Sequence, residues 1–69
     1  MRIEIFKDGW FNGTKITKKS AYEILGQKFV EKCINRVKEN NLKDDKLVAL
    51  SITHNNIRYD FCIKDILNN

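Results

Sequence analysis

The chain has 69 residues and carries thirteen lysines and arginines against nine acids, which gives a formal net charge of +4 at neutral pH. This length fits one domain over residues 1–69 with a small core, because a chain of this size buries only about 60% of its unfolded surface. The sequence shows neither a run of about 18 apolar residues nor an apolar stretch behind a charged leader, which disfavours membrane spanning and secretion. We therefore expect a cytoplasmic protein with no membrane contacts.

The positive charge is unevenly distributed along the chain. Residues 1–46 hold eleven lysines and arginines against seven acids, whereas residues 47–69 hold two against two. A basic chain attracts nucleic acids and acidic proteins, but +4 is too low to indicate polyanion binding by itself. The chain also lacks proline and is rich in lysine, isoleucine and asparagine. This composition is typical of AT-rich genomes, whose codon bias raises the number of lysines without selection for charge.

Alternating apolar and polar residues at the start of the chain predict a first strand over residues 1–7. The following Asp8-Gly9 pair readily adopts the positive φ angles of a tight hairpin turn. A second turn signal, Asn12-Gly13, precedes residues 14–16, so the second strand must be short or bulged.

Residues 18–40 change to helical spacing and predict a long amphipathic helix. Its apolar stripe consists of Tyr22, Leu25, Phe29, Val30, Cys33, Ile34 and Val37. Thr17 and Ser20 are both candidate N-caps, Ser20 through a capping box with Glu23. The Asn40-Asn41 pair suits a left-handed exit.

Gly26 lies within this apolar stripe, where glycine costs about 1 kcal/mol of helix propensity relative to alanine. We favour a continuous helix in which Gly26 allows close approach to a sheet. The alternative is a break at Gly26 that gives two short helices, and Ile24, which points away from the stripe, supports it.

Residues 47–54 and 57–63 alternate with period two around Asn55-Asn56, which predicts a β-hairpin whose two-residue turn fixes the register. One face pairs Ile52 with Tyr59, Leu50 with Phe61 and Val48 with Ile63. The other pairs Thr53 with Arg58, Ser51 with Asp60 and Ala49 with Cys62. An apolar sheet face and an amphipathic helix complete each other, so we expect an α+β fold with the order ββαββ, an antiparallel sheet with one long helix packed on one face.

Few residues carry recognisable chemistry. His54 is the only histidine and has no acid or cysteine at ligand spacing, and Asp44-Asp45 lacks the ligand number of a calcium loop. Cys33 and Cys62 form neither a disulfide framework nor a zinc pattern and are predicted to be reduced packing residues. We expect no catalytic residue, no metal and no cofactor, and therefore no enzyme.

The segment before the helix is the strongest candidate for ligand binding. It combines lysines with hydroxyl residues and no acid, at a helix start where positive charge opposes the macrodipole. Such a pattern suits an anion, such as a phosphate of nucleic acid or nucleotide, with a nearby aromatic residue stacking on a base. The residues of this predicted site are Trp10, Lys15, Thr17, Lys18, Lys19 and Ser20. The alternative is a set of solvated lysines in a lysine-rich protein.

The second face of the sheet is the other candidate. It mixes small apolar and polar residues, which suits a protein partner or a homodimer contact. Its predicted members are Ala49, Ser51, Thr53, Arg58, Asp60 and Cys62. An ordinary exposed sheet face is the alternative.

Two hypotheses of function follow. The first is a non-catalytic protein-binding module, accessory or regulatory, that docks on another protein or on a copy of itself through the sheet face or an edge strand. Its size and lysine-rich composition suit an accessory protein of a phage or mobile element. The second is a small basic nucleic-acid-binding domain that uses the lysine-rich helix start. Its outer contacts are Arg2, Lys7, Lys28 and Lys32.

Overall fold

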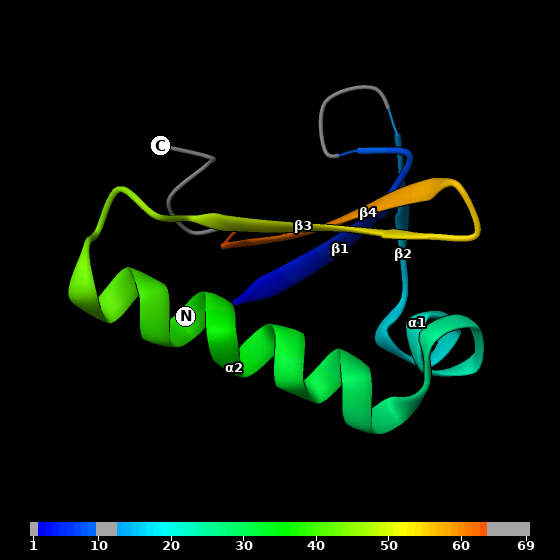
Figure 1. Cartoon of the computed structure of the whole chain (residues 1–69), viewed down its shortest axis with the longest axis horizontal. Helices are drawn as coiled ribbons and strands as arrows, with labels where there is room; N and C mark the ends of the chain where they lie inside the picture. The colour runs from blue at the N-terminus through cyan, green and yellow to red at the C-terminus, as the bar shows by residue number, and fades with distance from the viewer. Residues whose placement is uncertain (1, 10–12, 64–69) are drawn as a thin grey trace.

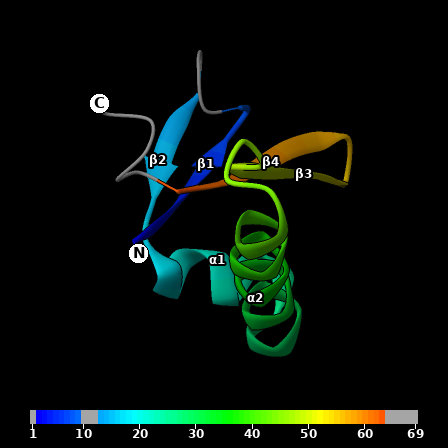
Figure 2. The same cartoon turned by 90° about the vertical axis from the view of Figure 1, so that its left-hand side faces the viewer.

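The computed structural model of the chain describes residues 2–9 and 13–63. These residues form an antiparallel sheet in the order β2-β1-β4-β3 and two helices (Figure 1). The elements are β1 (Ile3–Lys7), β2 (Thr14–Ile16), α1 (Lys18–Leu25), α2 (Gln27–Lys43), β3 (Ala49–His54) and β4 (Ile57–Ile63). Both helices lie on the same side of the sheet (Figure 2). The predicted α+β class and ββαββ order are therefore confirmed.

The β3–β4 hairpin has the predicted register. Asn55 and Asn56 adopt φ angles of 51° and 64°, as a two-residue turn between twisted antiparallel strands requires. All the predicted pairs within the two strands are observed, including Ile52 with Tyr59 and Ser51 with Asp60. Inner and outer faces of the hairpin are thus set by local sequence.

The first hairpin turns where Asp8 and Gly9 take positive φ angles of 69° and 94°. Lys7 pairs with Thr14, so residues 8–13 connect the two strands and the tight turn expected at Asp8-Gly9 is wrong. β2 has only three residues, which agrees with the expected short second strand. Residues 10–12, which include Trp10 and part of the expected second turn, lie outside the described residues.

The helical segment is broken at Gly26, so the expectation of one continuous helix is wrong. Gly26 has φ 92° and ψ 138°, a conformation that L side chains rarely adopt, and it ends α1 and begins α2. A Cβ added there would meet no atom within 4 Å, so close packing against the sheet does not explain the glycine. Its backbone conformation does.

The caps differ in part from the predicted ones. Thr17 is the N-cap of α1, and its Oγ1 accepts a hydrogen bond from the Ser20 N–H at 3.0 Å, so the Ser20 capping box is wrong. At the other end, α2 runs past Asn40 and Asn41 to Lys43 and ends on Asp44 in extended conformation. The predicted left-handed exit is therefore absent.

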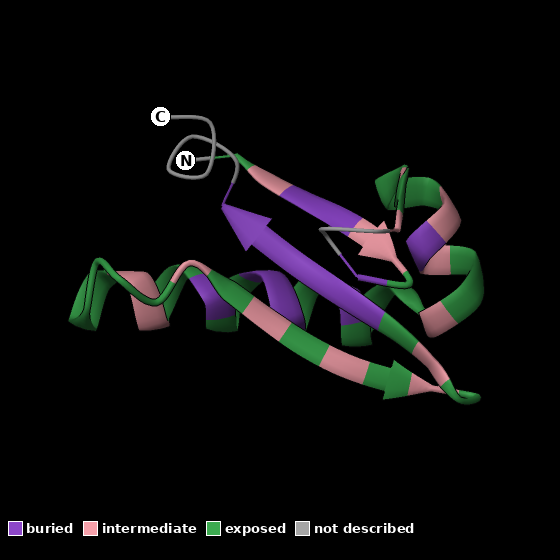
Figure 3. Ribbon diagram, turned by 90° about the horizontal axis from the view of Figure 1, so that it is seen from above, coloured by how far each residue is buried: buried purple, intermediate pink, exposed green. Residues whose placement is uncertain are grey.

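The core lies between the helices and the inner face of the sheet. Its buried members are Ile5, Ala21, Val30, Cys33, Ile34, Val37, Tyr59, Phe61 and Ile63. Figure 3 shows that burial is continuous along the last part of β4, whereas half-buried and exposed residues alternate along β3. Within the described residues, neither helix has the length and apolar character needed to cross a membrane.

Candidate functional site

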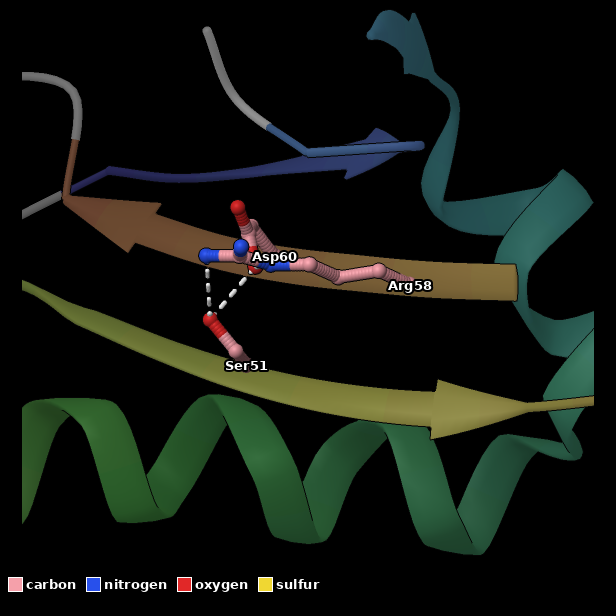
Figure 4. Close-up of polar contacts among 3 residues, drawn as sticks. All are labelled: Ser51, Arg58 and Asp60. Atoms are coloured by element: carbon pink, nitrogen blue, oxygen red, sulfur yellow. Dashed lines mark hydrogen bonds and ion pairs between the residues drawn. The ribbon is translucent and has the colours of Figure 1, made fainter. Parts of the chain in front are cut away.

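The outer face of the sheet carries a polar cluster, which we call the Ser51 cluster: Ser51 of β3 with Arg58 and Asp60 of β4 (Figure 4). The Ser51 hydroxyl donates to Asp60 Oδ1 at 2.6 Å, and Arg58 Nε donates to the same oxygen at 2.9 Å. Arg58 Nη2 also donates to Ser51 Oγ at 3.1 Å. The cluster joins β3 to β4 through side chains as well as through the backbone.

The centre of the outer face is buried rather than open. Asp60 and Cys62 are both completely inaccessible to solvent. The turn after β1 contributes to this burial, because a Cβ built on Gly9 would lie 3.7 Å from Asp60 Oδ2. Of the predicted partner face, the structure leaves Ala49, Ser51 and Thr53 exposed on β3, and Arg58 on β4.

Both cysteines are buried thiols with raised pKa values. The pKa of Cys62 is raised from 9.0 to about 11, mainly by burial and further by the nearby Asp60 carboxylate, against the opposing effect of Arg58. Burial also raises the pKa of Cys33, although Arg36 and Lys32 oppose it. A thiol is nucleophilic as the thiolate, so neither residue has the electrostatic setting of a reactive cysteine.

β3 is the longer of the two edge strands. Antiparallel pairing alternates, so every second residue directs its N–H and C=O groups away from the neighbouring strand. The Ile63 N–H donates to the Val48 carbonyl at 2.8 Å, which identifies Val48 and every second residue after it as those that bond β4. The backbone groups that face the other way belong to Ala49, Ser51 and Thr53. We call this set the β3 edge; no described strand pairs with it.

The two edges of the sheet differ in protection. β2 has three residues, and Lys15 stands at its centre. Short length and lysine are the usual means by which proteins prevent an edge strand from pairing with another chain. β3 has six residues, Ala-Leu-Ser-Ile-Thr-His, with no lysine, arginine, acid or proline. Within the described residues, the β3 edge is therefore the one that lacks these protective features.

Two exposed leucines lie on the segment that leads into β3. Leu42 is 81% exposed near the end of α2, and Leu47 is 48% exposed two residues before β3. A hydrogen bond from Asn41 Nδ2 to the Asp45 carbonyl, at 3.1 Å, stabilises this connection between α2 and β3. Apolar surface is thus available beside the start of the β3 edge.

A groove of about 450 Å³ lies where the sheet meets the helices on the β2 side. Its lining includes one carboxylate, Glu4, and four cations, Arg2, Lys15, Lys18 and Lys38; we call it the basic groove. Glu4 Oε1 lies 3.5 Å from Arg2 Nη2 and 3.4 Å from Lys15 Nζ. One acid among four cations leaves the groove with an excess of three positive charges.

The structure brings together only part of the predicted phosphate site. Lys15, Thr17 and Lys18 line the basic groove, whereas Lys19 and Ser20 do not. The Thr17 hydroxyl is engaged at the helix cap, where it also donates to Ser20 Oγ at 3.0 Å. Trp10 lies outside the described residues.

Sequence reasoning missed Lys38 as a member of this groove. The sequence gives Lys38 no role, because Lys38 and Lys15 line one groove only through the tertiary arrangement of α2 and β2. Its position four residues after the buried Ile34, on the same helix face, is the one local signal that was available.

His54 lies beside the turn that joins β3 to β4. It is half-buried at the end of β3, and its Nε2 lies 3.4 Å from Nδ2 of the neighbouring Asn55. In the part of the chain that the structure describes, no group of three or more histidine, cysteine, aspartate or glutamate residues is placed to hold a metal ion.

Comparison of the chain with protein-family models, with curated proteins and with solved structures finds no match in any of the three.

Proposed function

We propose that this chain is a non-catalytic protein-docking module whose docking element is the β3 edge. The observation that carries the proposal is the contrast between the two edges, a short β2 with a central lysine and a six-residue β3 without charge or proline. An extended segment of another chain that pairs with β3 gains main-chain hydrogen bonds to Ala49, Ser51 and Thr53.

The surroundings of β3 support docking at the edge rather than on the whole outer face. Asp60 and Cys62 are buried, so a partner has no access to the centre of that face. Exposed Leu42 and Leu47 lie on the approach to β3 and offer apolar contacts to a segment that extends past Ala49. Main-chain pairing with apolar contacts at one end is typical of strand addition.

The test compares two substitutions at Thr53, an exposed residue of the edge. Thr53→Pro removes the outward-facing N–H, whereas Thr53→Val keeps that N–H and the β-branched shape. Short displayed peptides are selected for binding to the wild-type protein. We expect the selected peptides to bind the Thr53→Val variant and to fail to bind the Thr53→Pro variant.

Amide hydrogen exchange locates the bound peptide. The amides of Ala49, Ser51 and Thr53 should become protected on binding, while those of β4, already paired, should change little. Peptides that bind Thr53→Pro as well as they bind the wild type would show that docking uses another surface.

A second candidate function, nucleic-acid binding, is favoured by the basic groove. Its excess of three positive charges suits a phosphate backbone, which contributes most of the sequence-independent affinity for nucleic acids. Arg2 and Lys38 line the groove in addition to the predicted Lys15 and Lys18. The site proposed is therefore the groove rather than the lysine run along the chain.

Matched charge reversals test this second candidate. Lys18→Glu with Lys38→Glu alters the groove, and Lys19→Glu with Lys32→Glu makes the same change of charge on the same two helices outside it. If the groove binds a single-stranded oligonucleotide, the first pair should abolish low-salt binding and the second should weaken it only modestly. Equal losses would indicate non-specific attraction to net charge.

A further inference from the structure

We infer that the β3 edge pairs with the β3 edge of a second copy of this chain, antiparallel and centred on Ser51. This inference rests on the proposed docking at β3 and names its partner. In an antiparallel pair, the residues that exchange hydrogen bonds must both direct their backbone groups into the interface. Ala49, Ser51 and Thr53 form such a set, and it is symmetric about Ser51.

This symmetry selects one register. With Ser51 opposite Ser51, Ala49 stands opposite Thr53 of the second copy, and every hydrogen-bonded pair lies within the bounds of β3. A shift toward the start of the chain pairs Thr53 with Leu47, whose N–H already donates to the Asp44 carbonyl at 2.9 Å. A shift toward the end brings in Asn55, which belongs to the turn.

The side chains of β3 are compatible with this pairing on both faces. On the outer face the opposed residues are small, Ala49 and Thr53, and both are exposed. On the inner face Leu50 stands opposite Ile52 of the second copy, and each is half-buried at the margin of the core. Apolar cross-strand pairs stabilise a sheet, so the second copy extends the core where one copy leaves it incomplete.

Charge also favours a second copy at this edge. The segment from residue 47 to residue 63 contains one cation and one anion, Arg58 and Asp60, joined to each other at 2.9 Å. The +4 charge of the chain therefore resides elsewhere. Two copies that meet through β3 bring their neutral segments together, whereas pairing through β2 would oppose Lys15 to the lysine of the other copy.

We expect the association to be weak, because one strand pair and its flanking contacts form a small interface that buries less than about 1,200 Å² of surface. It is therefore measured over a range of concentration, from about 10 µM to 1 mM, by sedimentation equilibrium. We expect a reversible monomer–dimer equilibrium within that range.

Paired charges at positions 49 and 53 test the register. In the inferred dimer, Ala49→Lys with Thr53→Lys opposes like charges twice, whereas Ala49→Lys with Thr53→Glu opposes unlike charges twice. The lysine pair should weaken dimerisation about tenfold or more, and the lysine–glutamate pair should stay within about threefold of the wild type. In a register shifted by two residues these positions do not face each other, so the two variants would not diverge in this way.

A third variant controls for net charge. Thr14→Lys with Asn35→Lys adds two positive charges at exposed positions on β2 and α2, away from β3. It should dimerise far better than the variant with lysine at positions 49 and 53. Circular dichroism confirms that each variant is folded before its association is measured.

The outcomes separate this inference from the proposed function. A wild-type protein that stays monomeric to 1 mM, or a lysine–glutamate variant as weak as the lysine pair, overturns the dimer. Selected peptides that still distinguish Thr53→Val from Thr53→Pro would then leave docking at β3 standing with a different partner. If neither dimer nor peptide depends on β3, both proposals fail.

Discussion

Asp60 is the residue on which the outer face depends most. It is fully buried, and its Oδ1 accepts hydrogen bonds from the Ser51 hydroxyl and from Arg58 Nε. Asp60→Ala removes both bonds and empties buried space, so we expect a loss of about 2–4 kcal/mol in the free energy of unfolding. Urea titration followed by circular dichroism measures it.

Asp45→Ala is the matched control for that loss, because Asp45 is an exposed acid in the connection between α2 and β3. Its effect should stay within about 0.5 kcal/mol, as for most exposed positions. If the two substitutions cost the same, the Ser51 cluster does not stabilise the fold.

The titration of Cys62 should make the free energy of unfolding depend on pH in the alkaline range. Its pKa is about 11 in the folded state against 9.0 for an unperturbed thiol, so the folded state holds the proton more tightly than the unfolded chain does. The resulting stability is fully present below pH 9 and is lost as the pH rises toward 11. Near pH 10 this loss amounts to about 1 kcal/mol per pH unit.

Cys62→Ala removes this titration and so isolates it from the lysines and tyrosines. We expect the difference in unfolding free energy between wild type and variant to shrink as the pH rises from 8.5 to about 10.5, measured by urea titration. A difference that stays constant across that range would contradict a raised pKa for Cys62.

At the scale of elements, the break between α1 and α2 depends on Gly26. Gly26→Ala places a side chain at φ 92°, so we expect a loss of about 1–3 kcal/mol in thermal or urea unfolding. A continuous helix predicts the opposite sign, a gain of about 1 kcal/mol, because alanine is the better helix former. Lys28→Ala, an exposed change in α2, is the control.

The β3–β4 hairpin could be predicted from the sequence because its signals are local. Asn55-Asn56 specifies a turn, and a two-residue turn fixes every pair along β3 and β4. The helix break could not be predicted in this way, because the apolar stripe continues on both sides of Gly26. A glycine at this position is compatible with a continuous helix and with two separate helices. The backbone conformation of Gly26, with φ 92°, accompanies the break, and Phe29, expected in the stripe, is 43% exposed.

For the candidate sites, too, some features could be predicted from the sequence and others depend on the tertiary structure. The exposed residues of β3 were predicted from period-two alternation, but the status of β3 as an edge depends on strand order, which pairs β1 with β4 at the centre of the sheet. The burial of Asp60 contradicts the ordinary expectation for a charged residue on a second face. Lys38 joins Lys15 only through the packing of α2.

At the scale of the whole molecule, the two proposed surfaces should respond to salt with opposite signs. The β3 edge is neutral, but each copy carries +4. With charge centres about 25 Å apart, two copies repel by about 1 kcal/mol at 0.01 M ionic strength and by about 0.1 kcal/mol at 0.15 M, where the Debye length falls from about 30 Å to about 8 Å. Dimerisation should therefore strengthen about fivefold across this range.

Binding of a single-stranded oligonucleotide in the basic groove should weaken over the same range. Four groove cations that each neutralise a phosphate give a slope of about −3 in log affinity against log salt, a loss of roughly three-thousandfold between 0.01 M and 0.15 M. Sedimentation equilibrium and oligonucleotide titration on one preparation measure both trends. Dimerisation that weakens with added salt would mean that charged groups meet across the interface, and the neutral β3 edge would then be the wrong surface.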